Sequence, residues 1–182
     1  VLALLHGQAF FALGFSIFFL ARRSARLEVA RGLSLLAAFG FCEAFVAWTP
    51  LALGSPRSPT LTIAWLRLMV MGAGYAFLLA FAMQTLAPSE RQQWKLWIPA
   101  GAVLAAWLVS LAGPLLTSLP HEQIILRGEI AARYGMALPG GLIAAWGLRR
   151  QAYHAMGHER LALIKPPINV TRVALGAFAV FG

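Results

Sequence analysis

The sequence predicts an all-α fold: a polytopic bundle of transmembrane helices with five full spans, a truncated sixth and the N-terminus outside. Composition is the first observation behind this prediction. Apolar residues make up 60% of the 182 residues and charged residues 12%, whereas soluble domains average about 45–50% and about 25%. The second observation is that the apolar residues gather in long runs. A helix needs about 20 apolar residues to cross a bilayer, and five runs reach that length.

The first predicted span opens the chain directly. No basic segment precedes it and no small-residue cleavage motif follows it, so we interpret it as a retained span and not as a signal peptide. It ends at Arg22 and Arg23, whose long side chains can reach lipid headgroups from a helix end. The predicted full spans are Val1–Ala21, Ala30–Leu53, Leu61–Leu86, Trp94–Leu116 and Ile124–Leu148.

The later spans are separated by segments rich in polar or helix-breaking residues. TPLALGSPRSPT follows the second span, APSERQQWK the third and GPLLTSLPHEQ the fourth. The longest connection, RRQAYHAMGHERLALIKPPINVTR, follows the fifth, and its two prolines cannot continue a helix interior. A sixth apolar run begins near Val173 and stops at Gly182. We therefore expect residues 1–182 to be a single transmembrane domain that is a segment of a longer chain.

The distribution of Lys and Arg predicts the orientation. In multi-span proteins the cytoplasmic loops carry the excess of basic residues. Here the second and fourth connections hold only Arg57 and Arg127. The first, third and fifth hold Arg22, Arg23, Arg26, Arg31, Arg91, Lys95, Arg149, Arg150, Arg160, Lys165 and Arg172. The alternation places the N-terminus outside and the long basic connection in the cytoplasm.

The formal net charge of +9 bears on the partners. Because the basic residues lie between apolar runs, we expect anionic lipid headgroups at the cytoplasmic face as their counterpart, and not nucleic acid. The single cysteine, Cys42, excludes an intrachain disulfide and a cysteine-based metal cluster. Only His6 among the histidines lies within a span, which disfavours haem held by two histidines. No cofactor and no metal are predicted.

Five ionisable residues fall inside the predicted spans, where such groups are costly and face a partner or a cavity. At 1.5 Å per residue, all five lie roughly 8 to 14 Å from the outer ends of their helices. Four helices thus place two acids, two bases and one histidine in one layer of the outer leaflet. These candidate site residues are His6, Glu43, Arg67, Glu129 and Arg133.

Two interpretations of this layer remain open. The functional one is a ligand or proton-sensing pocket open to the outside. The structural one pairs Glu129 with Arg133 along their helix, and Glu43 with Arg67 between helices, because structural ion pairs resemble sites.

Pro139, Gly140 and Gly141 interrupt the fifth span just inward of this layer. Proline removes a backbone hydrogen bond and bends a helix, and glycine allows a neighbouring helix to approach closely. The segment is therefore either a packing kink or a hinge that carries an event in the outer layer to the cytoplasmic end. Mid-span Trp107 is interpreted as a packing residue.

The opening segment LLHGQAFFALGFSIFFLARRSARLEVARGLSLLAAFGF resembles the N-terminal membrane portion of bacterial sensor proteins, mostly histidine kinases and some diguanylate cyclases. RYGMALPGGLIAAWGLRRQA, at residues 133–152, is similar to a later helix of that family. The chain departs from the family at Cys42-Glu43-Ala44, where a His-rich turn is frequent. The resemblance implies an input module in the bacterial cytoplasmic membrane, with its output domain past Gly182 and no catalytic residue within this sequence.

Three functions follow, in order of preference. The first is a membrane-embedded sensor module of a signal-transduction protein, which is not itself an enzyme. The second is an accessory or structural subunit of a larger respiratory or photosynthetic membrane complex. The third, a small transporter, ranks last because no charged residue is expected at mid-depth or deeper. Whichever function holds, the expected partners of the protein are the bilayer and either other membrane subunits or a second copy of the chain.

Overall fold

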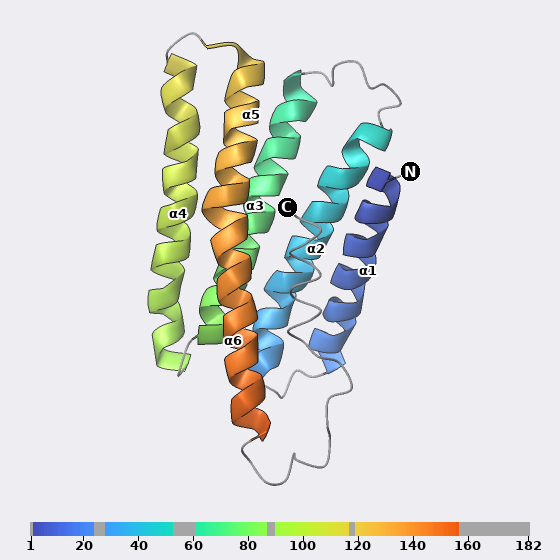
Figure 1. Ribbon diagram of the computed structural model, residues 1–182, viewed down its shortest axis with the longest axis vertical. Helices are drawn as coiled ribbons and strands as arrows, with labels where there is room; N and C mark the ends of the chain where they lie inside the picture. Colours follow the sequence, from blue (N-terminus) through green and yellow to red (C-terminus); the bar gives the residue numbers. More distant parts are fainter. Residues whose placement is uncertain (1, 24–27, 53–60, 87–89, 117–118, 157–182) are drawn as a thin grey trace.

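The computed structural model is all-α, and it describes residues 2–23, 28–52, 61–86, 90–116 and 119–156 (Figure 1). Apolar helix formers fill each run, and Pro or polar clusters separate the runs, so each helix forms where the apolar run predicts it. The helices are α1 (Leu2–Arg23), α2 (Glu28–Ala52), α3 (Leu61–Leu86), α4 (Glu90–Leu116), α5 (His121–Ala132), the π-helical turn η1 (Arg133–Ala137) and α6 (Leu138–Met156).

The segments α5, η1 and α6 form one continuous rod. At its centre the backbone N–H of Leu138 donates to the carbonyl of Arg133, five residues earlier. An α-helix closes this bond over four residues, so the π-turn holds one extra residue. The rod ends at Met156, and Arg149 and Arg150 therefore lie within α6 and not in a connection as predicted.

The predicted spans agree with the observed helices to different degrees. The third matches α3 at both ends, and the first two match α1 and α2 within two residues. The fourth was predicted to start at Trp94, but α4 starts at Glu90, because the polar residues before Trp94 are good helix formers and continue the helix past the apolar run. The predicted sixth span, near Val173, lies outside the described residues.

Within the described residues, four helices are long and apolar enough to cross a membrane: Leu2–Arg23, Gly32–Leu51, Leu61–Leu86 and Trp97–Pro114. These four candidate spans indicate a multi-pass membrane protein. The rod is not among them, because the π-turn divides it and α5 carries several charged residues. Its crossing of the membrane stays a prediction, as does the orientation.

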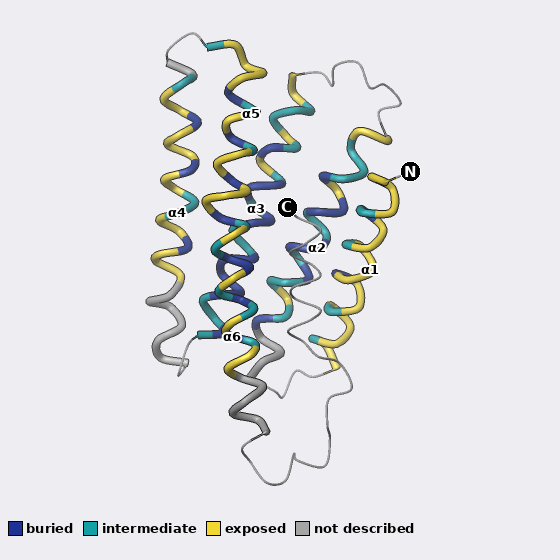
Figure 2. The backbone as a smooth tube through the Cα atoms, in the orientation of Figure 1, coloured by how far each residue is buried: buried dark blue, intermediate teal, exposed yellow. Residues whose placement is uncertain are grey.

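Helix α3 is the centre of the bundle. It packs against α2, α4, α5, η1 and α6, whereas α1 packs against α2 among the described segments. Figure 2 shows the consequence: α3 is largely buried or intermediate along its length, and α1 is mostly exposed. The main core cluster includes Phe39, Leu68, Met71 and Tyr75.

Trp107 is a packing residue, as predicted. It is 5% exposed, and its ring lies against Gly72 of α3, in space that any larger side chain at that position would occupy. Its indole Nε1 donates a hydrogen bond to the carbonyl of Gly128 at 3.0 Å. One side chain thus ties α4 to both α3 and α5.

Glycines bring α1 and α2 into backbone contact. A Cβ added at Gly40 would lie 3.0 Å from the Cα and N of Gly14 and 3.0 Å from the carbonyl oxygen of Phe10. All three atoms belong to the α1 backbone and cannot move aside without the helix. Small residues at such a crossing are what allows close helix packing in a bilayer.

We expect Gly40→Ala to weaken this crossing. The added methyl must push α1 away from α2, and overpacking of this kind costs about 1–3 kcal/mol. The measurement is the free energy of unfolding of the purified protein in detergent. Gly101→Ala in α4 is the matched control, because a Cβ there meets nothing within 4 Å. Equal effects of the two substitutions would show that the crossing is not tight.

Candidate functional site

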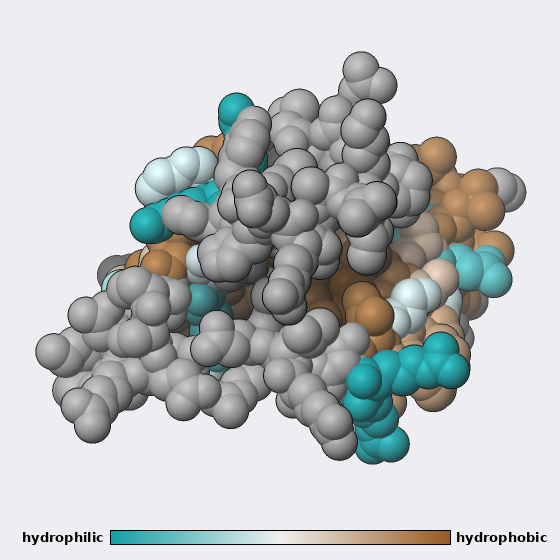
Figure 3. Space-filling view, turned by 90° about the horizontal axis from the view of Figure 1, so that it is seen from below, coloured by the Kyte–Doolittle hydropathy of each residue, from teal (hydrophilic) through white to brown (hydrophobic). Residues whose placement is uncertain are grey.

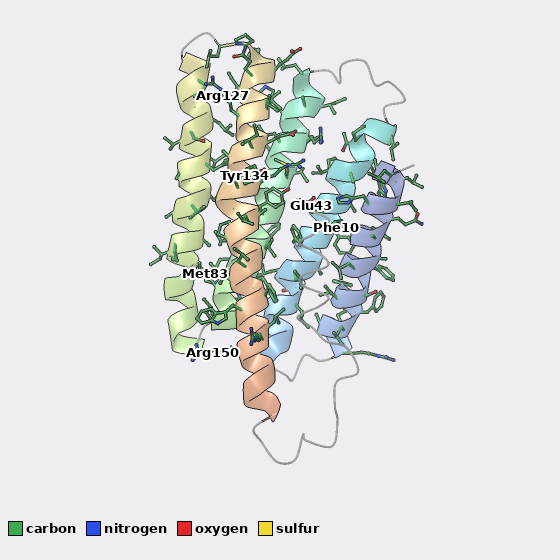
Figure 4. All side chains as sticks on the ribbon, in the orientation of Figure 1. Phe10, Glu43, Met83, Arg127, Tyr134 and Arg150 are labelled. Atoms are coloured by element: carbon green, nitrogen blue, oxygen red, sulfur yellow. The ribbon has the colours of Figure 1, made fainter. Side chains whose placement is uncertain are left out.

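Glu43 lies on the face of α2 that points into the bundle. Phe39, Glu43 and Val46 are 4%, 5% and 6% exposed, and their spacing of four and three residues puts them on one side of a helix. The same helical periodicity that buries the two apolar side chains therefore buries the acid. Figure 4 shows Glu43 on α2 at about the level of Phe10 on α1.

Tyr75 meets Glu43 from α3. Its hydroxyl donates a hydrogen bond to the Glu43 carboxyl group, and the residue is 2% exposed. Tyr75 was not among the predicted site residues. The sequence could have indicated it, because Tyr75 lies two turns after Arg67 on the same helix and therefore on a similar face. It also ends the small-residue segment MGAGY. A buried tyrosine hydroxyl needs a polar partner, and Glu43 is that partner.

Arg67 and Glu129 form an ion pair between α3 and α5, with Arg67 Nη1 3.6 Å from Glu129 Oε1. The side chains are 32% and 20% exposed. The structural interpretation had paired Arg67 with Glu43, and Glu129 with Arg133. The observed pairing differs because α5 packs directly on α3, which brings Glu129 to Arg67 while Tyr75 takes the Glu43 carboxyl group.

Arg133 completes the group at the first residue of the π-turn. It is close enough to Glu43 and to Tyr75 to interact with both electrostatically, and Arg67 also acts on Glu43. Arg133 itself is exposed. We call the five residues the polar cluster: Glu43, Arg67, Tyr75, Glu129 and Arg133. Two acids and two bases balance, so the cluster has no formal net charge.

Two atoms of the polar cluster lack hydrogen-bond partners within the part of the chain that the structure describes. They are Glu43 Oε1 and Arg67 Nε, and both are buried. A buried polar atom left without a partner costs about 1–3 kcal/mol, and more when the group is charged. The cluster is therefore balanced in charge and incomplete in hydrogen bonding.

His6 reaches the polar cluster through aromatic rings. Its imidazole lies 4.9 Å from the Phe10 ring of the same helix. Phe10 meets Phe39 of α2 edge-on at 5.8 Å, and Phe39 lies 6.3 Å from Tyr75 of α3. This row of rings connects α1 to the cluster through packing.

The candidate hinge residues, Pro139 to Gly141, begin two residues after the π-turn ends at Ala137. Pro139 has no N–H, and a proline ring clashes with the carbonyl four residues earlier in an α-helix, which here is that of Gly135. The wide turn from Arg133 to Ala137 includes Gly135, and we expect its extra residue to relieve that contact. The irregularity thus lies one turn before the predicted segment. Gly140 and Gly141 are buried, and Gly140 faces the Leu79 backbone of α3.

Fold and cluster together indicate the class: a multi-pass α-helical membrane protein with one buried acid, Glu43, and partly exposed charged side chains beside it. No family model matches the chain, and no curated protein and no solved structure is significantly similar to it. Any further assignment therefore depends on the geometry of the polar cluster.

A double-mutant cycle tests the Arg67–Glu129 pair. We expect Arg67→Gln and Glu129→Gln to destabilise the protein singly, and the double variant to lose less than their sum, with a coupling of about 1–2 kcal/mol. Unfolding free energies of purified protein give the coupling. Arg127→Gln combined with Glu129→Gln is the control, since residues two apart face different sides of a helix. A coupling near zero for Arg67 and Glu129 would contradict the pair.

Deleting Gly135 tests why the π-turn exists. The deletion leaves α5 and α6 in register and forces an α-helix, so the Pro139 clash returns and should cost about 3 kcal/mol. Adding Pro139→Ala should restore most of that loss. The control is deletion of Leu142, which turns the rest of α6 by about 100° and should abolish folding. If Pro139→Ala rescues nothing, the proline does not cause the π-turn.

Proposed function

We propose that this chain is a membrane-embedded sensor module of a signal-transduction protein, with the polar cluster as its signal site. The observation that carries the proposal is Glu43, a 5% exposed acid that interacts with arginines from two other segments. One of its oxygens has no hydrogen-bond partner among the described residues. Ionisable groups at such positions in membrane helices are more often functional than structural. The resemblance of the opening segment to bacterial sensor proteins supports the same function.

The rod formed by α5, η1 and α6 supplies a path for the signal. Arg133 stands in the polar cluster and begins the π-turn, and Arg149 and Arg150 lie near the far end of the same rod. Turns of this type occur frequently at functional sites. A change in the cluster that alters the π-turn would rotate α6, because the helix beyond the turn moves as a unit. Helix shifts of this kind transmit signals in other membrane and soluble proteins.

The basic end of the bundle is the side that the proposal assigns to the cytoplasm. Arg22 and Arg23 end α1, and the Arg22 guanidinium lies 4.8 Å from the centre of the Phe18 ring. Figure 3 shows the bundle from this end, where hydrophilic residues (teal) lie at the edge of the molecule next to hydrophobic ones (brown). Anionic headgroups would hold these arginines at the surface of a bacterial cytoplasmic membrane. The module would catalyse no reaction and would act on an output domain in the cytoplasm.

An accessory subunit of a larger membrane complex is the second candidate. The observation in its favour is the exposure of α1 and α4, whose outward side chains include Phe15, Phe19, Ile98 and Val109 at 49%, 51%, 59% and 70%. In a bilayer such faces contact lipid or a neighbouring helix. The subunit function predicts that the polar cluster only holds helices together, so its residues would affect assembly and nothing else.

Glu43→Gln separates the two candidates. For a sensor we expect near-normal expression and a shift of about 2–5 Å between spin labels at Arg23→Cys and Arg150→Cys, because loss of the charge releases Arg133 and the rod. Pulsed electron paramagnetic resonance on the purified Cys42→Ala protein measures this distance. Glu122→Gln, an exposed acid of α5, should leave it unchanged. Reduced expression with an unchanged distance in the protein that is recovered would favour the structural function and contradict the sensor.

A further inference from the structure

Glu43 is a buried acid with fewer partners than a negative charge requires. Its carboxyl group accepts a hydrogen bond from Tyr75, and its Oε1 has no partner among the described residues. An ionised carboxylate can accept about four hydrogen bonds, and a buried charge that lacks them is costly. Hydrogen bonding therefore supports the ionised form of Glu43 only in part.

The arginines of the polar cluster compensate this charge only in part as well. In the part of the chain that the structure describes, Arg67 forms its ion pair with Glu129 and not with Glu43. Arg67 and Arg133 act on Glu43 electrostatically, and the hydrogen bond to its carboxyl group comes from Tyr75. Arg133 is exposed, and 32% of the Arg67 side chain is exposed too. Neither arginine thus holds the carboxyl group in its ionised form by direct contact.

Tyr75 suits both forms of the acid. A tyrosine hydroxyl donates one hydrogen bond and also accepts, so it can donate to the carboxylate and accept from the neutral acid. The change needs a rotation of the O–H group and no movement of the ring, which is 2% exposed and packs near Phe39. Protonation forms one O–H bond on Glu43 with a proton from water, and no bond of the protein breaks.

A proton is also the one ligand that the burial of Glu43 does not oppose. Glu43 Oε1 is buried, and any molecule that bound it would need space, whereas a proton needs none. Fully buried carboxyl groups of other proteins bind and release protons. The packing around Glu43 is therefore compatible with a proton as ligand.

The charged and titratable groups around Glu43 come from both helices that pack on α2 and from the rod. They are Arg67 and Tyr75 on α3, Arg133 on the π-turn, Glu129 on α5, Cys42 on α2 itself and, behind the rings of Phe10 and Phe39, His6 on α1. Arginine stays charged at every working pH, and histidine ordinarily titrates near neutral pH. His6 is therefore the competing proton site, and the experiment must separate it from Glu43.

We infer that Glu43 is a reversible proton-binding site and that this proton is the signal of the polar cluster. The formal charges of the cluster cancel while Glu43 is ionised, and protonation leaves one positive charge in excess. Arg133 then has no negative charge on α2 to attract it, so the rod is released from α2. The inference deepens the proposed sensor function and rests on it for this consequence alone, because proton binding is measured without any signalling output.

Infrared difference spectroscopy of the full chain in lipid nanodiscs tests the site, with the pH varied from about 4 to about 10 to cover ordinary and buried carboxyl groups. A protonated carboxyl group has a carbonyl stretching band that neither a carboxylate nor a histidine has. The chain has six acids, all glutamates, so substitution can assign the band. We expect a band that titrates within this range, is lost in Glu43→Gln and is kept in Glu122→Gln, an exposed control. A Glu43 band that is absent throughout, or constant throughout, would overturn the inference.

Tyr75→Phe assigns the band even if Glu43→Gln prevents folding. The substitution removes the hydrogen bond to the carboxyl group, so the band should change frequency. Its titration midpoint should rise by about one pH unit, because a hydrogen bond to the ionised form is the stronger one. Tyr134→Phe is the matched control, since Tyr134 lies on the rod and is 70% exposed (Figure 4). Equal changes in both variants would overturn the assignment to Glu43.

The spin-label distance between Arg23→Cys and Arg150→Cys, measured over the same pH range in the Cys42→Ala protein, separates the two proposals. We expect the distance to change with the midpoint of the band, and Glu43→Gln to hold it at its low-pH value throughout. A titrating band with a constant distance supports the proton site and contradicts the sensor. A distance change that persists in Glu43→Gln and is lost in His6→Gln makes His6 the proton site and overturns the inference.

Discussion

The arrangement of this protein depends on the cost of charge between apolar helices. Four formal charges stand within one layer, and each needs an opposite charge or a polar neighbour to remain there. Glu129 and Arg67 form an ion pair, and Tyr75 and two arginines offset part of the cost of burying Glu43. The helices that carry these groups cannot slide past one another without separating charges. The cluster thus fixes the relative heights of α2, α3 and α5, which apolar packing alone leaves loosely specified.

Apolar packing then fixes how closely the helices approach. Hydrophobic side chains gain nothing by leaving lipid for a helix interface, so close contact depends on small residues and on specific hydrogen bonds. Gly14 and Gly40 bring α1 and α2 together, and Gly72 accepts the ring of Trp107. The Trp107 hydrogen bond to Gly128 adds a polar tie where α4 would otherwise be held by dispersion alone. The charged groups therefore act on the relative heights of the helices, and the glycines act on the distances between them.

Helix positions and the grouping of four charged residues could be predicted from the sequence, and their partners could not. Run length located α3 at both ends, and counting residues placed Glu43, Arg67, Glu129 and Arg133 in a common layer, where they interact. Depth, however, gives a residue's height and not the direction in which its side chain points. That direction depends on which helices are neighbours, so the pairing of Arg67 with Glu129 was missed. Tyr75 was missed because its ring suits an apolar core equally well.

The π-turn lies where the polar cluster meets the close packing of the helices. The turn begins at Arg133, a member of the polar cluster, and ends two residues before Pro139. If the π-turn only accommodated the proline, the charge of its first residue would not matter. Here the carboxyl group that attracts Arg133 lies on α2, while α3 packs against α5, the π-turn and α6, so the attraction reaches from α2 to a rod that α3 supports on both sides of the turn. A change in charge at Glu43 would therefore act on the rod at Arg133, the first residue of the π-turn, and against the support that α3 gives on either side.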